Sequence, residues 1–331
     1  MYILIIQAKN LSREFTVYSK NSDSFFMLNQ IIGRKGTKKK VVDNINMYIE
    51  EGEIVGYLGP NGAGKSTTIK MLSGVLTPTS GELTVLGKEP SKNRKEHAKN
   101  IGVLYGQRTQ LWWDLPLKDS FELLKAIYKI DSQLYKKRLS NFIEILDMED
   151  FLNRPVRQLS LGQRMRGEMV ATLLHSPPIL FLDEPTIGLD VLAKLKIQEF
   201  LKFLNKEEGT TILITSHNMD DIEKLCNRIV LIDQGKIMFD GSKESLKRKT
   251  TRKDLLIIEV SPEDMNKTSS IIPIRREENT LYFEVSTHEE VPQLINELSK
   301  QFRILKIEVE TPGIEQVLRE LYEKKQYEVM L

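Results

Sequence analysis

The segment between residues 59 and 67 has the composition and spacing of a phosphate-binding loop. It reads GPNGAGKST, with four residues between Gly59 and the Gly64-Lys65-Ser66 triplet. The glycines allow the backbone amides to turn toward an anion at the start of a helix. Lys65 adds a full charge, and an ion pair at about 4 Å with an effective dielectric near 20 is worth roughly 4 kcal/mol. A plain glycine-rich turn is the alternative, and the complete motif disfavours it.

The loop predicts a set of nucleotide contacts. Ser66 is in addition a predicted Mg²⁺ ligand through its hydroxyl group. The predicted phosphate-binding residues are Gly59, Pro60, Asn61, Gly62, Ala63, Gly64, Lys65, Ser66 and Thr67.

Two acidic residues follow a second apolar run. Residues 179–182 read ILFL, and Asp183 and Glu184 come directly after them. In doubly wound sheets ligands bind beyond the carboxyl ends of strands, so the pair is expected at the nucleotide. Asp183 is a predicted Mg²⁺ ligand, directly or through water. Glu184 is the predicted general base, a role that contributes about 10²–10⁴-fold to rate. Solvated acids at a strand end are the alternative reading.

A histidine ends a third apolar run. Residues 210–215 read TTILIT and lead through Ser216 to His217. His217 is predicted to bond the terminal phosphate and the water or acid beside it. The remaining histidines, which have no such setting, are predicted to be surface or structural residues: His97, His175 and His288.

A second short motif, LSLGQ at residues 159–163, is predicted to open a helix whose N-terminus faces an anion. Together and in this order, the motifs resemble the nucleotide-binding subunit of an ATP-binding cassette (ABC) transporter, over roughly residues 1–245. In that family the LSLGQ-type signature is the most specific mark, because other phosphate-loop ATPases lack it. The resemblance implies ATP and Mg²⁺ as cofactors.

The resemblance also implies roles for further residues. Gln107 matches the glutamine that touches Mg²⁺ and water and senses the membrane partner, which makes it a candidate catalytic and metal residue. Ser160 and Gly162, with Gln163 completing the signature, match residues that contact the terminal phosphate in the opposing subunit. Asp190, in the Gly-Leu-Asp segment, matches the loop that links the two sites.

Phe15 lies where the family stacks an aromatic ring on adenine, with Tyr18 as the fallback.

Two features depart from the family pattern. The signature has Leu161 at the position where its commonest form has glycine. Residues 18–40 form a longer segment than a minimal cassette has. The longer segment is read as a loop or hairpin insertion, or as a contact with anionic headgroups or the membrane subunit.

The apolar runs predict an α/β phosphate-loop ATPase core with an antiparallel β subdomain and a helical insert at about residues 117–160. The N-terminal residues 1–7 are predicted to form an edge strand. The predicted core strands cover residues 53–58, 101–105, 179–182, 210–215, 229–232 and 236–239.

The ATPase domain is predicted to cover residues 1–245. Residues 246–253 (LKRKTTRK) are basic and predict a linker. Residues 254–331 then predict a small α+β domain without a catalytic constellation, whose role is dimer support or a regulatory surface. Its predicted strands cover residues 255–260, 280–285 and 304–309, and its predicted helices cover residues 290–302 and 314–322.

Composition restricts the class of protein. The 331 residues carry a net charge of +2, which argues against a nucleic-acid binder that works through net charge. The single cysteine, Cys226, excludes an internal disulfide and a cysteine metal cluster. No run approaches the roughly 20 apolar residues that a membrane span needs.

By resemblance, one chain supplies half of each of two nucleotide sites. The expected partners are an identical or homologous cassette and transmembrane permease subunits on separate chains, with no nucleic acid. Trp112 and Trp113, both beside Gln107, predict contact of at least one tryptophan with the permease. The predicted location is the cytoplasmic face of the cell membrane, as a peripheral subunit of an exporter. The alternatives are a soluble ABC-type ATPase acting on ribosomes or nucleic acid, and a nucleotide-gated regulatory protein.

Overall fold

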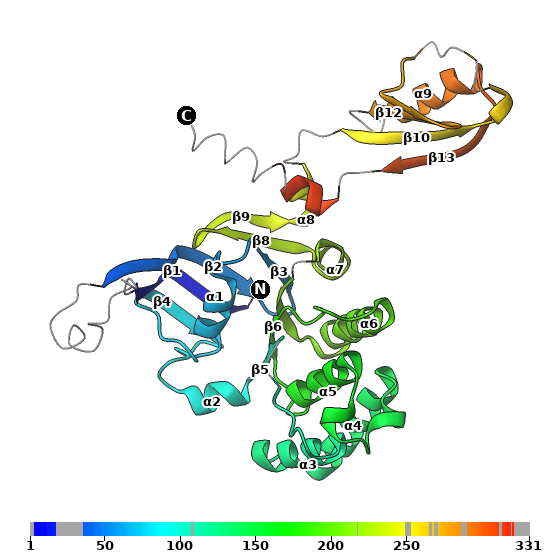
Figure 1. Cartoon of the computed structure of the whole chain (residues 1–331). Helices are drawn as coiled ribbons and strands as arrows, with labels where there is room; N and C mark the ends of the chain where they lie inside the picture. The colour runs from blue at the N-terminus through cyan, green and yellow to red at the C-terminus, as the bar shows by residue number, and fades with distance from the viewer. Residues whose placement is uncertain are drawn as a thin grey trace, which may run out of the picture. The chain divides into compact units, whose positions relative to one another are not determined.

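The computed structural model describes residues 3–17, 36–106, 109–216, 218–248, 253–264, 267, 271–285, 290–310, 313–318 and 320. The chain divides into two compact units, Met1–Ser242 and Lys243–Leu331 (Figure 1). None of the helices in the described residues combines the length and the apolar character needed to cross a bilayer.

The centre of the first unit is a six-stranded sheet with the strand order β5-β6-β7-β3-β8-β9. Its first five strands run parallel and β9 is antiparallel to β8. The parallel strands are short apolar runs, which is the pattern of strands covered on both faces. The strands are β3 (Ile54–Leu58), β5 (Ile101–Tyr105), β6 (Ile179–Asp183), β7 (Thr211–Thr215), β8 (Arg228–Asp233) and β9 (Lys236–Ser242).

A separate three-stranded antiparallel sheet consists of β1 (Leu4–Val17), β2 (Thr37–Glu50) and β4 (Ser80–Val85), in the order β2-β1-β4. The predicted N-terminal edge strand is therefore wrong, because β1 lies in the middle. Ile6 is opposite Ile49 on one side and Val85 on the other. Both partner strands come later in the chain, so the N-terminal residues alone could not reveal them.

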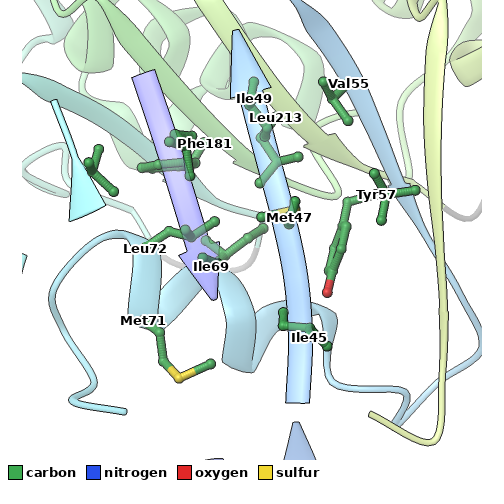
Figure 2. Packing of buried hydrophobic residues seen from close by; sticks show 14 of the residues in the cluster. Ile45, Met47, Ile49, Val55, Tyr57, Ile69, Met71, Leu72, Phe181 and Leu213 are labelled. Carbon is green, nitrogen blue, oxygen red and sulfur yellow. The ribbon is translucent and has the colours of Figure 1, made fainter. Parts of the chain in front are cut away.

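Helix α1 (Lys65–Leu72) packs in a buried cluster that takes side chains from both sheets (Figure 2). The Tyr57 hydroxyl lies 3.2 Å from the Thr68 hydroxyl, which joins β3 to α1 inside this core. Burial raises the pKa of Tyr57. The cluster holds the loop between β3 and α1 at a fixed place. Its members include Ile45, Met47, Ile49, Val55, Tyr57, Ile69, Met71, Leu72, Phe181 and Leu213.

The helical insert follows β5. Asp131 caps α4 by accepting bonds from two backbone amides, and the Phe142 ring meets Phe200 of α6 edge to face at 5.0 Å. The short helix α2 was not predicted, because its sequence (RKEHAK) has no apolar stripe. The helices of the first unit after α1 are α2 (Arg94–Lys99), α3 (Leu117–Tyr128), α4 (Ser132–Ile145), α5 (Leu161–Leu173), α6 (Val191–Glu208) and α7 (Met219–Leu225), with 3-10 turns at Glu149–Phe151 and Val156–Gln158.

Two histidines have the structural role that the sequence predicted. His97 Nε2 lies 2.8 Å from the Leu72 carbonyl oxygen. The His175 ring stacks on Tyr128 with a centroid distance of 4.1 Å. Burial lowers the pKa of both imidazoles, so the neutral form is favoured in each case. His288 lies outside the described residues.

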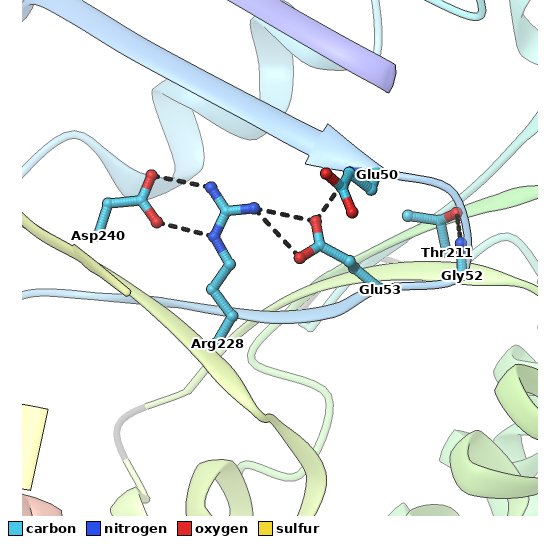
Figure 3. A network of polar contacts seen from close by, with 6 residues as sticks. All are labelled: Glu50, Gly52, Glu53, Thr211, Arg228 and Asp240. Carbon is cyan, nitrogen blue, oxygen red and sulfur yellow. Dashed lines mark hydrogen bonds and ion pairs between the residues drawn. The ribbon is translucent and has the colours of Figure 1, made fainter. Parts of the chain in front are cut away.

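Arg228 ties the start of β3 to the β8–β9 hairpin (Figure 3). Its guanidinium donates two bonds to Asp240, at 2.8 and 2.9 Å, and further bonds to Glu53, at 2.9 and 3.2 Å. Glu53 also accepts a bond from the Glu50 amide at 2.8 Å. The two carboxylates raise the pKa of Arg228. The network fixes the strand that leads into the phosphate loop.

Arg228→Ala is expected to lower the free energy of unfolding of the first unit by about 2 kcal/mol, because two partly buried carboxylates lose their partner. Urea unfolding followed by tryptophan fluorescence measures this, since both tryptophans lie in that unit. Arg228→Lys keeps the charge but loses the paired bonds, so its loss should be smaller. An unchanged midpoint for Arg228→Ala would contradict the role of the network.

The second unit contains a four-stranded antiparallel sheet in the order β11-β12-β10-β13. Residues 246–247, predicted to begin a linker, instead complete α8 (Lys243–Lys247), and Leu246 is fully buried. The three-residue strand β11 was not predicted because all its residues are polar and exposed. The elements are β10 (Asp254–Val260), β11 (Arg275–Glu277), β12 (Thr280–Val285), α9 (Glu290–Ser299) and β13 (Ile304–Glu310), with a 3-10 turn at Pro262–Asp264.

Candidate nucleotide-binding and catalytic site

The glycine-rich segment forms the turn between β3 and α1. Gly62 and Gly64 have φ angles of +81° and +110°, a backbone region that favours glycine. A Cβ on Gly59 would lie 2.1 Å from the Ile232 carbonyl oxygen, and one on Gly64 would lie 2.6 Å from the Val41 carbonyl oxygen. Gly64 is therefore needed for close packing as well as for the turn, whereas Gly59 is needed for close packing and Gly62 for the turn.

Lys65 is the first residue of α1 and is almost fully buried. Its ammonium group donates to the carbonyl oxygens of Gly59, at 2.7 Å, and Pro60, at 3.1 Å. Burial lowers the pKa of Lys65, and the negative charges of Glu184 and Asp183 oppose that shift. The lysine is thus a positive charge in a poorly solvated place, held over its own loop.

The acid pair ends β6 next to the end of β7. The Thr215 hydroxyl donates to Asp183 Oδ1 at 2.7 Å, and Asp183 is directly opposite Thr215 in the parallel ladder. The Glu184 amide donates to the Thr215 carbonyl at 3.1 Å, and Glu184 has a φ of +56°. A positive φ is uncommon for a residue with a side chain. It turns the backbone at Glu184, so the carboxylate points in a different direction from the one it would have if β6 continued.

A cavity of about 260 Å³ brings loop and acid pair together. Ser66 from the loop shares it with Asp183 and Glu184 from the end of β6. The sequence analysis did not assign the four other lining residues to the site, although Lys70 lies one helical turn after Ser66 and the spacing could have revealed it. The lining residues are Ser66, Lys70, Tyr105, Gly106, Asp183, Glu184 and Ile187.

Two predicted catalytic residues, Gln107 and His217, lie outside the described residues. Their neighbours in the chain are described. Gly106 lines the cavity and its amide donates to the Asp183 carbonyl at 2.9 Å. Thr215 is the last residue of β7 and bonds Asp183.

The signature residues begin helix α5. The Ser160 hydroxyl accepts a bond from the Gln163 amide at 3.2 Å, and Gln163 Oε1 accepts one from the Ser160 amide at 3.0 Å. This reciprocal capping box engages both side chains locally. Neither residue lines the cavity with Glu184. A Cβ on Gly162 would come 3.1 Å from the Ala193 Cβ, so α5 packs closely on the start of α6.

Asp190 caps α6 by accepting a bond from the Ala193 amide at 2.8 Å. Leu161 packs against Gly188, where a Cβ would meet the leucine at 3.0 Å. The signature and the Gly-Leu-Asp loop are thus in contact in one chain. None of the signature residues 159–163 or the loop residues 188–190 lines the cavity that contains Asp183 and Glu184.

Phe15 is on β1, opposite Lys39 of β2, and 37% of its surface is exposed. The Arg13 guanidinium lies 4.7 Å from its ring centroid. An exposed ring on a strand can stack on a base, and this role stays a prediction. The fallback Tyr18 lies outside the described residues, as do residues 18–35 of the longer segment.

Comparisons with known proteins agree on one family. A family model described as ABC transporter matches residues 42–187, which include the loop, the signature and the acid pair. The ABC transporter ATP-binding protein NatA of Bacillus subtilis (strain 168) is 35% identical over 227 residues, covering 68% of this chain and 92% of NatA. The linearmycin resistance ATP-binding protein LnrL of the same organism is 36% identical, covering 63% of this chain and 67% of LnrL.

A solved structure supports the same fold. It is a dimeric ATP-binding cassette in a post-hydrolysis state bound to ADP and Pi. It is 26% identical and superposes with a TM-score of 0.59, covering 72% of this chain and 98% of that chain. The predicted fold of a phosphate-loop ATPase core with an antiparallel subdomain is confirmed.

Proposed function

Because this chain belongs to the ATP-binding proteins of the ABC transporter family, which are ATPases, we propose that it works as one of two cassettes that close on Mg-ATP to power export through separate membrane subunits. The observation that carries the proposal is the shared cavity of Ser66, Asp183 and Glu184. LnrL, by name a resistance protein, supports the outward direction.

The residues present fit a magnesium ion that arrives with the nucleotide. Ser66 and Asp183 offer oxygen atoms to one cavity, and Mg²⁺ in such sites takes one or two protein oxygens together with phosphates and waters. In the described residues no group of three or more His, Cys, Asp or Glu side chains could hold a metal by itself, which suits a nucleotide-dependent site. When bound, Mg²⁺ would neutralise phosphate charge.

The shared cavity of Ser66, Asp183 and Glu184 supports a proposed sequence of steps for ATP hydrolysis. Lys65 and the loop amides hold the β- and γ-phosphates in place. A water oxygen attacks the γ-phosphorus, and Glu184 accepts the proton that the water loses. The bond from the γ-phosphorus to the bridging oxygen breaks and leaves ADP and phosphate. Gln107 and His217 are proposed to orient the water and the terminal phosphate.

A second cassette is proposed to complete each site. Ser160 and Gly162 stand at the N-terminus of α5, away from their own chain's cavity, and a helix N-terminus suits the phosphates of a nucleotide on another chain. The partner is an identical or a homologous cassette. Membrane subunits on separate chains would place this protein at the cytoplasmic face of the membrane.

A groove beside the nucleotide cavity is the proposed docking site for a membrane subunit. It has a volume of about 220 Å³ and includes Trp113, Arg164 and Glu168. Tyr105 and Gly106 line both the groove and the nucleotide cavity, so the two share a wall that leads directly to residue 107. A partner seated in the groove could sense movements of that wall.

The groove combines an aromatic surface with buried charge. Trp113 is 48% exposed, and the Arg164 guanidinium lies 5.8 Å from its ring centroid. Glu168 accepts bonds from the Thr109 hydroxyl and from the Gln110 amide, the latter at 3.2 Å. Burial raises the pKa of Glu168. Tryptophan and arginine are enriched among the residues that dominate binding energy at protein interfaces, and both are present in this groove.

Trp113→Ala is therefore expected to weaken association with the membrane subunit by roughly 30-fold or more, the effect of losing an interface anchor. The measurement is recovery of a multi-span membrane protein with the tagged chain from detergent-solubilised membranes. Tyr48→Ala is the matched control, because Tyr48 is a similarly exposed aromatic residue on β2. Equal recovery with Trp113→Ala, or co-purification of RNA or DNA instead, would contradict the proposal.

A further inference from the structure

Strand β13 is an edge of the sheet in the second unit. In the described residues β13 pairs with β10 and with no other strand. Ile307 is opposite Ile258, and Val309 is opposite Leu256. Directly opposite residues share a face of the sheet, so Ile307 and Val309 extend the apolar face that contains the buried Leu256 and Ile258.

The cover of this apolar face reaches only the first residue of β13, Ile304, which packs against the core. Helix α9 contributes Leu298 and partly buried residues to the core over β10 and β12. On β13, however, Ile307 remains 43% exposed and Val309 36% exposed. The strand thus offers an apolar strip next to a row of backbone groups that no described strand occupies, which is the arrangement that accepts a further strand.

We propose that β13 pairs in antiparallel fashion with β13 of a second copy of this chain, about a two-fold axis at Ile307. In this register Ile307 meets Ile307 of the second copy. Lys306 is opposite Glu308, and Leu305 is opposite Val309. Because the contact is symmetric, each of the last two pairs occurs twice.

Charge selects this register among the neighbouring ones. A shift of the axis to residue 308 would put two Glu308 carboxylates opposite each other, and an axis at residue 306 would oppose two Lys306 ammonium groups. An axis between residues would place Ile307 against a charged residue and exchange the two faces of the sheet. Of these registers, only the one centred on Ile307 matches apolar with apolar residues and opposite charges with each other over residues 305–309.

Edge strands commonly carry lysine to prevent pairing with another chain. In β13 the charge of Lys306 is balanced by Glu308, which already accepts a bond from it at 2.9 Å within the strand. Both side chains are largely exposed, so they are free to exchange this weak contact for one across the two-fold axis. Lys306 and Glu308 are therefore complementary to the same pair of residues in a second β13.

This contact does not depend on the proposed function, because the residues assigned to nucleotide binding lie in the first unit. It predicts a dimer of the full chain in the presence of EDTA and without nucleotide, detectable by sedimentation velocity. Lys306→Glu and Glu308→Lys each create like charges in two pairs per dimer and should weaken the dimer by about tenfold or more.

Mixing the two single variants restores opposite charges in both pairs, so the heterodimer should form with near wild-type affinity. The double variant K306E/E308K should also dimerise. Glu277→Lys, on the opposite edge strand β11, is the control for charge reversal and should dimerise like the wild type. A monomeric wild-type chain, single variants that dimerise normally, or a mixture that stays monomeric would each overturn the proposal. The first outcome is also the one expected if the C-terminal residues or another protein cover β13.

Discussion

Glu184→Gln is expected to slow ATP hydrolysis by roughly 10²–10⁴-fold while ATP binding is kept. Glutamine has nearly the same shape but cannot accept a proton from the attacking water. The backbone turn at residue 184 is held by a hydrogen bond from its backbone amide to the Thr215 carbonyl oxygen. The substitution leaves this hydrogen bond unchanged. The nucleotide should therefore remain uncleaved in an otherwise normal site.

The same variant is expected to accumulate as a nucleotide-loaded dimer, because the contacts made by the γ-phosphate to both cassettes persist. To separate this from the contact through β13, the test uses the combination of Glu184→Gln with Lys306→Glu. Sedimentation with saturating Mg-ATP should show a dimer that is lost when nucleotide is removed. Each dimer should retain two ATP molecules.

A matched control is Glu199→Gln, an exposed carboxylate on α6, which should hydrolyse ATP at the wild-type rate. Two outcomes would contradict the mechanism. One is a wild-type rate in Glu184→Gln, which would assign the proton transfer to another group. The other is a variant that stays monomeric with saturating Mg-ATP, which would remove the reason for placing Ser160 of one chain at the nucleotide of the other.

Local patterns revealed most of the parts that position the site. Strand β5 was predicted with its observed bounds, and β6 and β7 to within one residue, because their apolar runs end at polar motifs. The loop between β3 and α1 was evident because glycine spacing and the lysine belong to one local turn. The shared cavity of Ser66, Asp183 and Glu184 follows from parallel strands that end at one edge.

Features that depend on distant partners could not be predicted in this way. The Thr215 hydroxyl donates a hydrogen bond to Asp183 because β7 lies beside β6. Neither strand's own sequence indicates which strand will be its neighbour. Likewise, the central position of β1 depends on β2 and β4. The capping box of Ser160 and Gln163, in contrast, is a local pattern of residues three apart, which the sequence alone can reveal.

Lys65→Ala is expected to weaken Mg-ATP binding by about 10²–10³-fold. The ammonium group is nearly buried, so its attraction to phosphate is screened less than that of a surface lysine. A loss of roughly 4 kcal/mol corresponds to about this change in the dissociation constant. Isothermal titration calorimetry at fixed salt and Mg²⁺ measures it, with circular dichroism to verify that the variant is folded.

Lys70→Ala provides the sharpest comparison, because Lys70 carries the same charge, lies further along α1 and lines the cavity that contains Ser66, Asp183 and Glu184. Lys70 is exposed, so water and salt screen it and its loss should weaken binding only a few-fold. Lys65→Arg should fall between the two, since the charge remains but the larger guanidinium does not fit the space beside Gly59 and Pro60. If Lys70→Ala weakens Mg-ATP binding as much as Lys65→Ala does, the affinity for the nucleotide comes from net charge near the cavity. The buried position of Lys65 over its loop would then not be the source of phosphate binding.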